Sequence, residues 1–131
     1  MVPGTIRDLK AMLLGMSPRL SDRVWCFHKV SDARFIPDTA FAIIREEEGV
    51  CCILPAQAAP ADAPQFAQIT LRVHSDLEAV GLTAAVASVL ANSGIACNVI
   101  AGLHHDHLFV PFAQRDEALA LLNRLSLDAR R

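Results

Sequence analysis

The sequence predicts an α+β fold in which antiparallel sheets carry helices on one face. Three observations support this prediction. Residues 68–74 alternate strictly between apolar and polar side chains and then give way to a helical apolar stripe. The elements of the second half follow the order strand–helix–strand–strand–helix, which is typical of this class. A stretch with three prolines at 55–64 divides this half from a strand-rich first half.

The first half is expected to contain one helix and three strands. Residues 5–14 carry apolar side chains at helical spacing, and Thr5 with Asp8 resembles a capping box. Residues 24–30 are rich in β-branched and aromatic side chains, which predicts a strand. Residues 40–46 and 50–54 are strand-like and are separated by a Glu-Glu-Gly turn, which predicts a hairpin.

The second half begins with the alternating strand at 68–74. Ser75 and Glu78 form a Ser-x-x-Glu capping box, so a helix is expected from Leu77 to residue 91, with Asn92-Ser93-Gly94 as its stop.

Strands at 95–100 and 105–112 and a helix at 115–125 complete the order, which is the start of a ferredoxin-like βαββαβ unit. The last strand of such a unit is missing, because residues 126–131 are short and charged. An open sheet edge must be covered. We therefore expect the strands of the first half to form a second sheet, docked on the first or continuous with it.

Composition excludes several classes of protein. The chain has 131 residues with 12 Lys and Arg against 14 Asp and Glu, a net charge of −2, which excludes a strongly basic nucleic-acid binder. No apolar run approaches the roughly 20 residues that span a membrane. The N-terminus lacks the pattern of a signal peptide, and the four cysteines show no CxxC spacing. A cytoplasmic location with reduced cysteines is expected, with no nucleic-acid or membrane partner.

Metal and catalytic chemistry find little support. In a strand, His105 and His107 would share a face and could form one arm of a metal site. A third ligand would have to come from His28, His74 or Glu48, and nothing local supplies it. No nucleophile elbow, HExxH, phosphate loop or dinucleotide fingerprint is present. We expect no metal, no cofactor and no enzymatic activity.

The loop-to-helix junction at 75–83 is the better candidate site. Free backbone N–H groups and the helix dipole favour an anionic group, such as a carboxylate, at a helix N-terminus. Gly81 lies inside the helical pattern, where glycine costs about 1 kcal/mol relative to alanine. Close approach of a ligand or another backbone would explain this glycine, and so would close packing of the helix on the sheet.

Several motifs carry a resemblance to a known family. SDLEAVGLTAAV, GIACNV and HDHLFVP in the second half resemble the ACT-domain family, and LLGMSP, VWCFHKV and REEEGVCCILP look like a matching N-terminal unit. The chain most resembles small stand-alone bacterial proteins with two ACT-like units. The resemblance implies an N-terminal ACT-like unit at 1–61 and a C-terminal ACT domain at 62–131.

The resemblance also implies a function. ACT domains typically bind a small effector, often an amino acid, between two units, through the loop after the first strand and through the second strand. Here the ligand carboxylate would meet the backbone N–H groups near Leu77–Gly81. Asn98 would orient the ligand, and Glu48 would meet its amine. The residues implied in binding are Glu48, Ser75, Asp76, Leu77, Val80, Gly81 and Asn98.

One departure from the family pattern is evident, since this loop is longer than the usual Asp-x-Pro-Gly loop and lacks its proline. The expected protein is a non-catalytic regulatory homodimer that binds an amino acid. The alternative is a protein-interaction or dimerisation module without a metabolite ligand.

Overall fold

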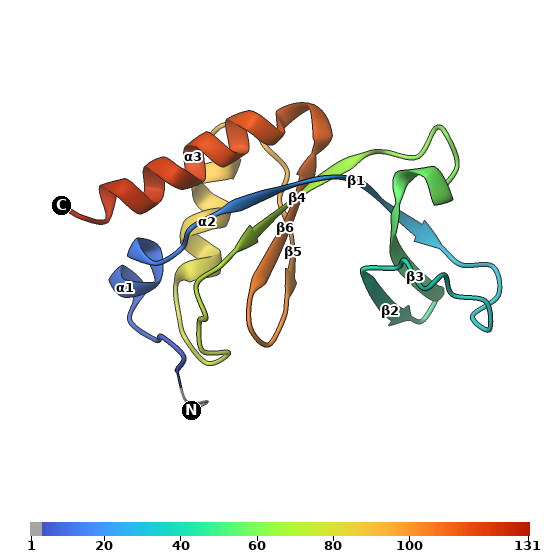
Figure 1. Ribbon diagram of the computed structural model, residues 1–131, viewed down its shortest axis with the longest axis horizontal. Helices are drawn as coiled ribbons and strands as arrows, with labels where there is room; N and C mark the ends of the chain where they lie inside the picture. The colour runs from blue at the N-terminus through green and yellow to red at the C-terminus, as the bar shows by residue number, and fades with distance from the viewer. Residues whose placement is uncertain (1–3) are drawn as a thin grey trace. The chain divides into compact units, whose positions relative to one another are not determined.

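The computed structural model describes residues 4–131 and has an α+β fold, as predicted (Figure 1). Three α-helices, six strands and two short 3-10 helices are assigned among these residues. In chain order they are α1 (Leu9–Leu14), β1 (Arg19–Lys29), β2 (Ala42–Glu46), β3 (Gly49–Pro55), η1 (Ala56–Ala58), β4 (Phe66–Leu71), α2 (Leu82–Ala91), β5 (Asn98–Ala101), β6 (Asp106–Pro111), η2 (Phe112–Gln114) and α3 (Arg115–Asp128).

The strands follow the hydrogen-bonded order β2-β3-β1-β4-β6-β5. The pairs β1–β3, β2–β3 and β5–β6 are antiparallel. The strand β1 lies beside β4, where a ferredoxin-like unit would place its last strand. A strand from the N-terminal half thus takes the position that residues 126–131 do not fill.

The chain forms two compact units. Unit 1 contains residues 4–21 and Ala67–Arg131, and unit 2 contains Asp22–Phe66. The segment 4–21 thus packs with the second half of the sequence, although it precedes the whole of unit 2. The division of the sequence into ACT-like repeats at 1–61 and 62–131 stays a prediction, because compact units report contacts and not sequence repeats.

Unit 1 has its helices packed on one face of its strands, as expected (Figure 1). The predicted apolar face is buried in the core at Ile69, Leu71 and Val73, but β4 ends at Leu71 and not at residue 74, and Gln68 on the other face is buried as well. Side chains from β6 and from all three helices also belong to this core: Met12, Leu82, Val86, Leu90, Leu108, Val110, Ala118 and Leu122. The helix α3 continues to Asp128, so no further strand follows it in unit 1.

Unit 2 is built on the predicted hairpin. Glu46 pairs with Gly49, so Glu47 and Glu48 form the turn between β2 and β3. Gly49 has a φ of +139°, a backbone conformation that favours glycine. The rings of Trp25 and Phe41 pack edge to face with centroids 5.7 Å apart.

The start of the first helix differs from the expectation. Thr5 does not cap it, because α1 begins at Leu9 and Asp8 is its N-cap, whose carboxylate accepts a 2.9 Å hydrogen bond from the N–H of Ala11. The hydroxyl of Thr5 instead donates a 3.0 Å hydrogen bond to Asp76, 71 residues along the chain. The spacing of Thr5 and Asp8 therefore suggested a local cap, whereas Thr5 makes a long-range contact.

Candidate functional site

A hollow of about 530 Å³ opens in unit 1 beside the N-terminus of α2. Its walls come from the loop at 75–80, the first turns of α2 and the turn between β5 and β6. The lining combines apolar side chains with polar groups at a few positions, among them Asp76 and Asp106. The residues used below are Asp76, Leu77, Val80, Gly81, Leu82, Thr83, Ala84 and Asp106.

The loop is held by Asp76 and not by a helix cap. One carboxylate oxygen of Asp76 accepts a 2.8 Å hydrogen bond from the N–H of Glu78, and the other accepts the hydroxyl of Thr5. The hydrogen bond from Glu78 is the main cause that lowers the pKa of Asp76, and the bond from Thr5 acts in the same direction. The predicted capping box at Ser75 and Glu78 is therefore wrong. Ser75 instead forms an isolated parallel β-bridge with Ile6, Glu78 lies in a turn closed by the 3.0 Å hydrogen bond from the N–H of Ala79 to the carbonyl of Asp76, and α2 begins only at Leu82.

Gly81 is the N-cap of α2 and has a φ of +112°. Because glycine has no side chain, no side-chain hydrogen bond caps this helix. The first intrahelical bond runs from the N–H of Ala85 to the carbonyl of Gly81, at 2.9 Å. The N–H groups of Leu82, Thr83 and Ala84 precede that bond, and all three residues line the hollow. The expectation of N–H groups suited to an anion is therefore shifted from Leu77–Gly81 to the first turn of α2.

Packing also favours glycine at position 81. A Cβ atom at this position would lie 3.1 Å from Cδ2 of Leu9 in α1. The close neighbour is thus a side chain of α1, and neither the backbone of the sheet nor a ligand is needed to explain the glycine.

Asp106 is the site residue that sequence reasoning missed. It is the first residue of β6, pairs with Ala101 of β5, and lies on the strand face that carries Leu108 and Val110 into the core. Its side chain is half-buried in the wall of the hollow, and burial raises the pKa of its carboxyl, while the charges of nearby His107 and His105 act in the opposite direction. The signal was present in the motif HDHLFVP, where strand alternation sets Asp106 on the apolar face.

The other predicted site residues divide into two groups. Ser75, Asp76, Leu77, Val80 and Gly81 all line the hollow. Val80 and Leu77 are 84% and 65% exposed, so these side chains do not plug it.

Asn98 and Glu48 do not line the hollow. Asn98 is exposed and pairs with Phe109, whose carbonyl accepts a 3.2 Å hydrogen bond from the Asn98 amide. This residue lies on the opposite face of the strand from Val99, which packs against the core. Glu48 belongs to unit 2, in the turn of its hairpin. The binding roles predicted for these two residues stay predictions.

The histidines make contacts that do not resemble a metal site. The Nδ1 atom of His107 lies 3.2 Å from Nε2 of Gln68 and 3.1 Å from Oγ1 of Thr70. Burial lowers the pKa of His107. His74 and His104 stack with ring centroids 5.0 Å apart. Over residues 4–131, no group of three His, Cys, Asp or Glu side chains could hold a metal ion.

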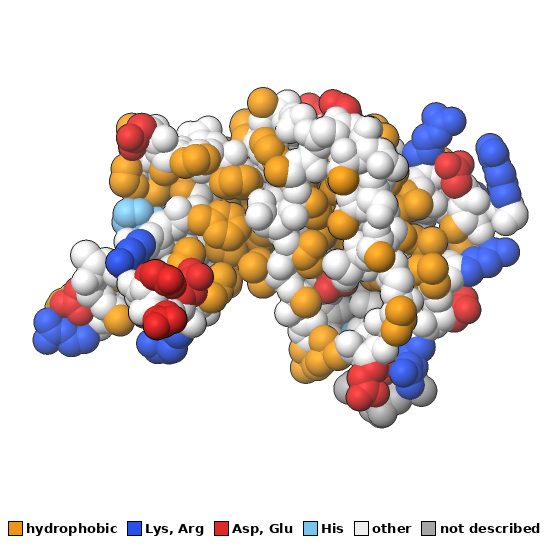
Figure 2. All heavy atoms as spheres, turned by 180° about the vertical axis from the view of Figure 1, so that it is seen from behind, with side chains coloured by type: hydrophobic (Ala, Val, Ile, Leu, Met, Phe, Trp, Pro, Cys, Tyr) orange, Lys and Arg blue, Asp and Glu red, His pale blue; other side chains and the backbone are white. Residues whose placement is uncertain are grey.

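Charge and hydropathy of the surface agree with the composition. On the face drawn in Figure 2, Lys and Arg side chains occur in small separate groups with Asp and Glu near them, and they do not form one basic patch. Among the helices in the described part of the chain, none combines the length and the apolar character needed to cross a membrane.

Comparison with known proteins identifies the family. Two family models, both described as ACT domain, match residues 65–124 and 4–69. The chain resembles a Vibrio cholerae protein of unknown function, for which a transport role has been suggested, with 43% identity over 86% of this chain and 92% of that one and a TM-score of 0.76. A search of curated proteins found no match.

Two structures with 12% identity share the fold. One belongs to the aspartokinase α and β subunits and is covered over 82% of this chain and 95% of that one, with a TM-score of 0.58. The other, from Porphyromonas gingivalis, is assigned as a C-terminal regulatory domain of aspartate kinase, with coverage of 82% and 94% and a TM-score of 0.52. The two family matches and the 43% identical relative lead to one conclusion: the chain belongs to the ACT-domain family.

Proposed function

We propose that this protein is a non-catalytic regulatory protein that binds a free amino acid in the hollow of unit 1. Membership of the ACT-domain family supports the regulatory class, since ACT domains typically bind amino acids, and a regulatory domain of aspartate kinase shares the fold. The volume of about 530 Å³ lies in the range of about 300–1,000 Å³ of small-molecule sites.

The observation that carries the proposal is the pairing of opposite electrostatic partners across one hollow. The uncapped N-terminus of α2 supplies N–H donors for a carboxylate. Asp106 supplies a half-buried carboxylate for an ammonium group. A free amino acid carries both groups on one carbon atom. In this arrangement Asp106 replaces Glu48 as the partner of the amine.

Thermal unfolding of the full chain with each of the twenty amino acids tests the proposal. A ligand at 100 times its dissociation constant stabilises the folded state by about 2.7 kcal/mol, which raises the melting temperature by several degrees. The N-acetyl derivative of the best ligand lacks the ammonium group. The carboxamide of the same ligand keeps the ammonium group and lacks the carboxylate. Both are expected to bind at least tenfold more weakly, and full affinity of either derivative would contradict the assigned contacts.

Variants locate the ligand. Asp106→Asn removes the charge in the hollow and is expected to weaken amino-acid binding at least tenfold in calorimetric titration. Asp116→Asn changes an exposed carboxylate on α3 that does not line the hollow, and it serves as the matched control. Equal affinities of the two variants would place the ligand elsewhere, and no response to any amino acid would refute the function.

A second candidate function rests on Val80 and Leu77. These two large apolar side chains are exposed together on the loop beside the hollow. Exposed apolar residues of this kind are typical of protein contact sites. A protein-interaction module without a metabolite ligand would show no response in the amino-acid screen, and Val80→Ser would abolish its complex with its protein partner.

A further inference from the structure

The lining of the hollow in unit 1 restricts the side chain of the ligand as well as its charged groups. Ala84 and Ala87 lie one turn apart on α2, and Ala101 ends β5, so these parts of the wall carry only methyl groups. Leu77 and Val80 contribute larger apolar side chains from the loop before α2. The hollow therefore has an apolar wall besides the two polar anchors assigned above.

Among its described residues, the hollow offers no second charged partner for an ionised ligand side chain. Lys, Arg and His are absent from these lining residues, so an acidic side chain would meet no cation. Asp76 is buried, and its two carboxylate oxygens already accept hydrogen bonds from Thr5 and from the N–H of Glu78. Asp106 is the partner assigned to the ligand ammonium group. Because an unpaired charge is costly to bury, the lining disfavours both acidic and basic side chains.

Leu77 and Val80 are the most exposed apolar part of this wall. Both side chains are largely exposed to water in the absence of a ligand. An apolar ligand side chain that lay against them would remove apolar surface of both partners from water, which stabilises the complex. A polar or very small side chain would leave this surface uncovered.

We propose that the hollow of unit 1 selects free amino acids whose side chain is apolar and larger than a methyl group, and that this side chain packs against Leu77 and Val80. The selection rests on the proposed function, because the two charged contacts are those of the proposed amino-acid site. The ligand is then held at three places: its carboxylate at the first turn of α2, its ammonium group at Asp106, and its side chain at the loop.

Calorimetric titration of the full chain with leucine, alanine, asparagine and aspartate tests the proposal. Leucine is expected to bind at least tenfold more tightly than alanine, because one methylene in an apolar pocket changes affinity about 10–200-fold. Asparagine and aspartate have nearly the shape of leucine but carry polar ends, and both should bind at least tenfold more weakly. If any of these three bound as tightly as leucine, the selection would be overturned while the proposed function would stand. No binding of any of the twenty amino acids would refute both.

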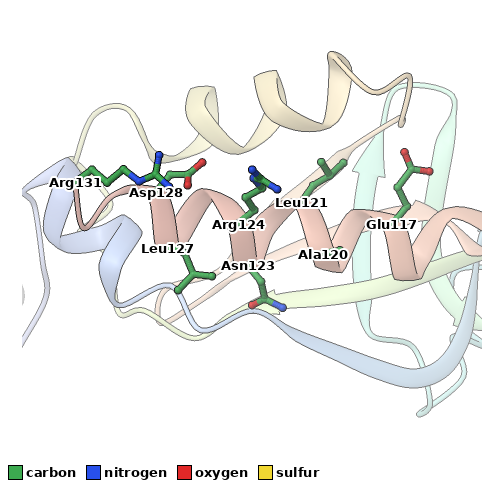
Figure 3. Close-up of a pocket in the computed structure, with 8 residues that line it drawn as sticks. All are labelled: Glu117, Ala120, Leu121, Asn123, Arg124, Leu127, Asp128 and Arg131. Carbon is green, nitrogen blue, oxygen red and sulfur yellow. The ribbon is translucent and has the colours of Figure 1, made fainter.

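Variants assign the preference to the loop. Val80→Ser removes one apolar side chain of the wall and leaves both charged contacts in place, so leucine binding should weaken at least fivefold while alanine binding stays within about twofold. The matched control is Leu127→Ser. Leu127 is also apolar and exposed, but it lies on α3 in a separate groove, outside the hollow (Figure 3). This control should keep both affinities. Equal losses for leucine and alanine in Val80→Ser, or equal losses in the two variants, would overturn the assignment.

Discussion

Gly81→Ala is expected to destabilise unit 1 by about 2–3 kcal/mol, for two reasons that the structure separates. The φ of +112° lies outside the left-handed region that side-chain-bearing residues tolerate, and such strain costs about 1–3 kcal/mol. The added Cβ would also lie 3.1 Å and 3.3 Å from the two terminal methyl groups of Leu9. Leu9 is 38% exposed, so it can move partly aside, and the contact adds to the strain without dominating it.

Gly94→Ala is the matched control. Gly94 has a φ of +71°, close to the ordinary left-handed region, and a Cβ there would meet nothing within 4 Å. Its expected cost is about 1 kcal/mol, from backbone strain alone. Both variants remove the same backbone freedom from the unfolded chain, so this contribution cancels in the comparison.

Urea unfolding followed by circular dichroism measures both free energies. Combining Gly81→Ala with Leu9→Ala closes a double-mutant cycle, which isolates the contact between the two side chains. We expect the cost of Gly81→Ala to be about 0.5–1 kcal/mol smaller when Leu9 is alanine. The reasoning is refuted if Gly81→Ala costs no more than Gly94→Ala, or if the cycle shows no coupling.

Three further predictions concern the packing and titration of unit 1. Leu122→Ala removes a fully buried side chain from the core and should cost about 2–5 kcal/mol in urea unfolding; a cost under about 1 kcal/mol would contradict this account of the core. Ser126→Ala removes the 2.7 Å hydrogen bond from its hydroxyl to the carbonyl of Leu13 and should cost about 1 kcal/mol, whereas a neutral effect would show that water replaces the bond. Burial lowers the pKa of His107, so the unfolded chain binds this proton more tightly than the folded one. The free energy of unfolding should therefore rise with pH between the lowered pKa and about 6.5, and the rise should be smaller in His107→Gln; an unchanged slope would assign it to other groups.

Local sequence patterns predicted most of the individual elements. The apolar face of β4 and the Glu-Glu-Gly turn of the hairpin were read correctly because each depends on neighbouring residues. The error at the start of α2 has the same origin. Ser75 and Glu78 have the spacing of a capping box, yet Asp76 forms the turn because Thr5 and the N–H of Glu78 occupy its carboxylate.

The candidate site was predicted in part. The loop at 75–81 was identified from its place before a helix, and the five predicted loop residues do line the hollow. Asp106 was missed because a strand's alternation indicates which face a residue occupies and does not indicate what lies above that face. The contribution of α1 was also missed, since Leu9 approaches Gly81 from 72 residues away.

The sequence by itself determined the class of fold, the helical and extended segments, and the family, because periodicity and motifs are properties of consecutive residues. Only the tertiary structure decided that residues 4–21 pack with the second half of the chain and that β1 lies beside β4. It also decided that the N-terminus of α2 and Asp106 share one hollow. The physical reason is that a buried face packs against a complementary face. The local sequence does not indicate which distant segment provides that second face.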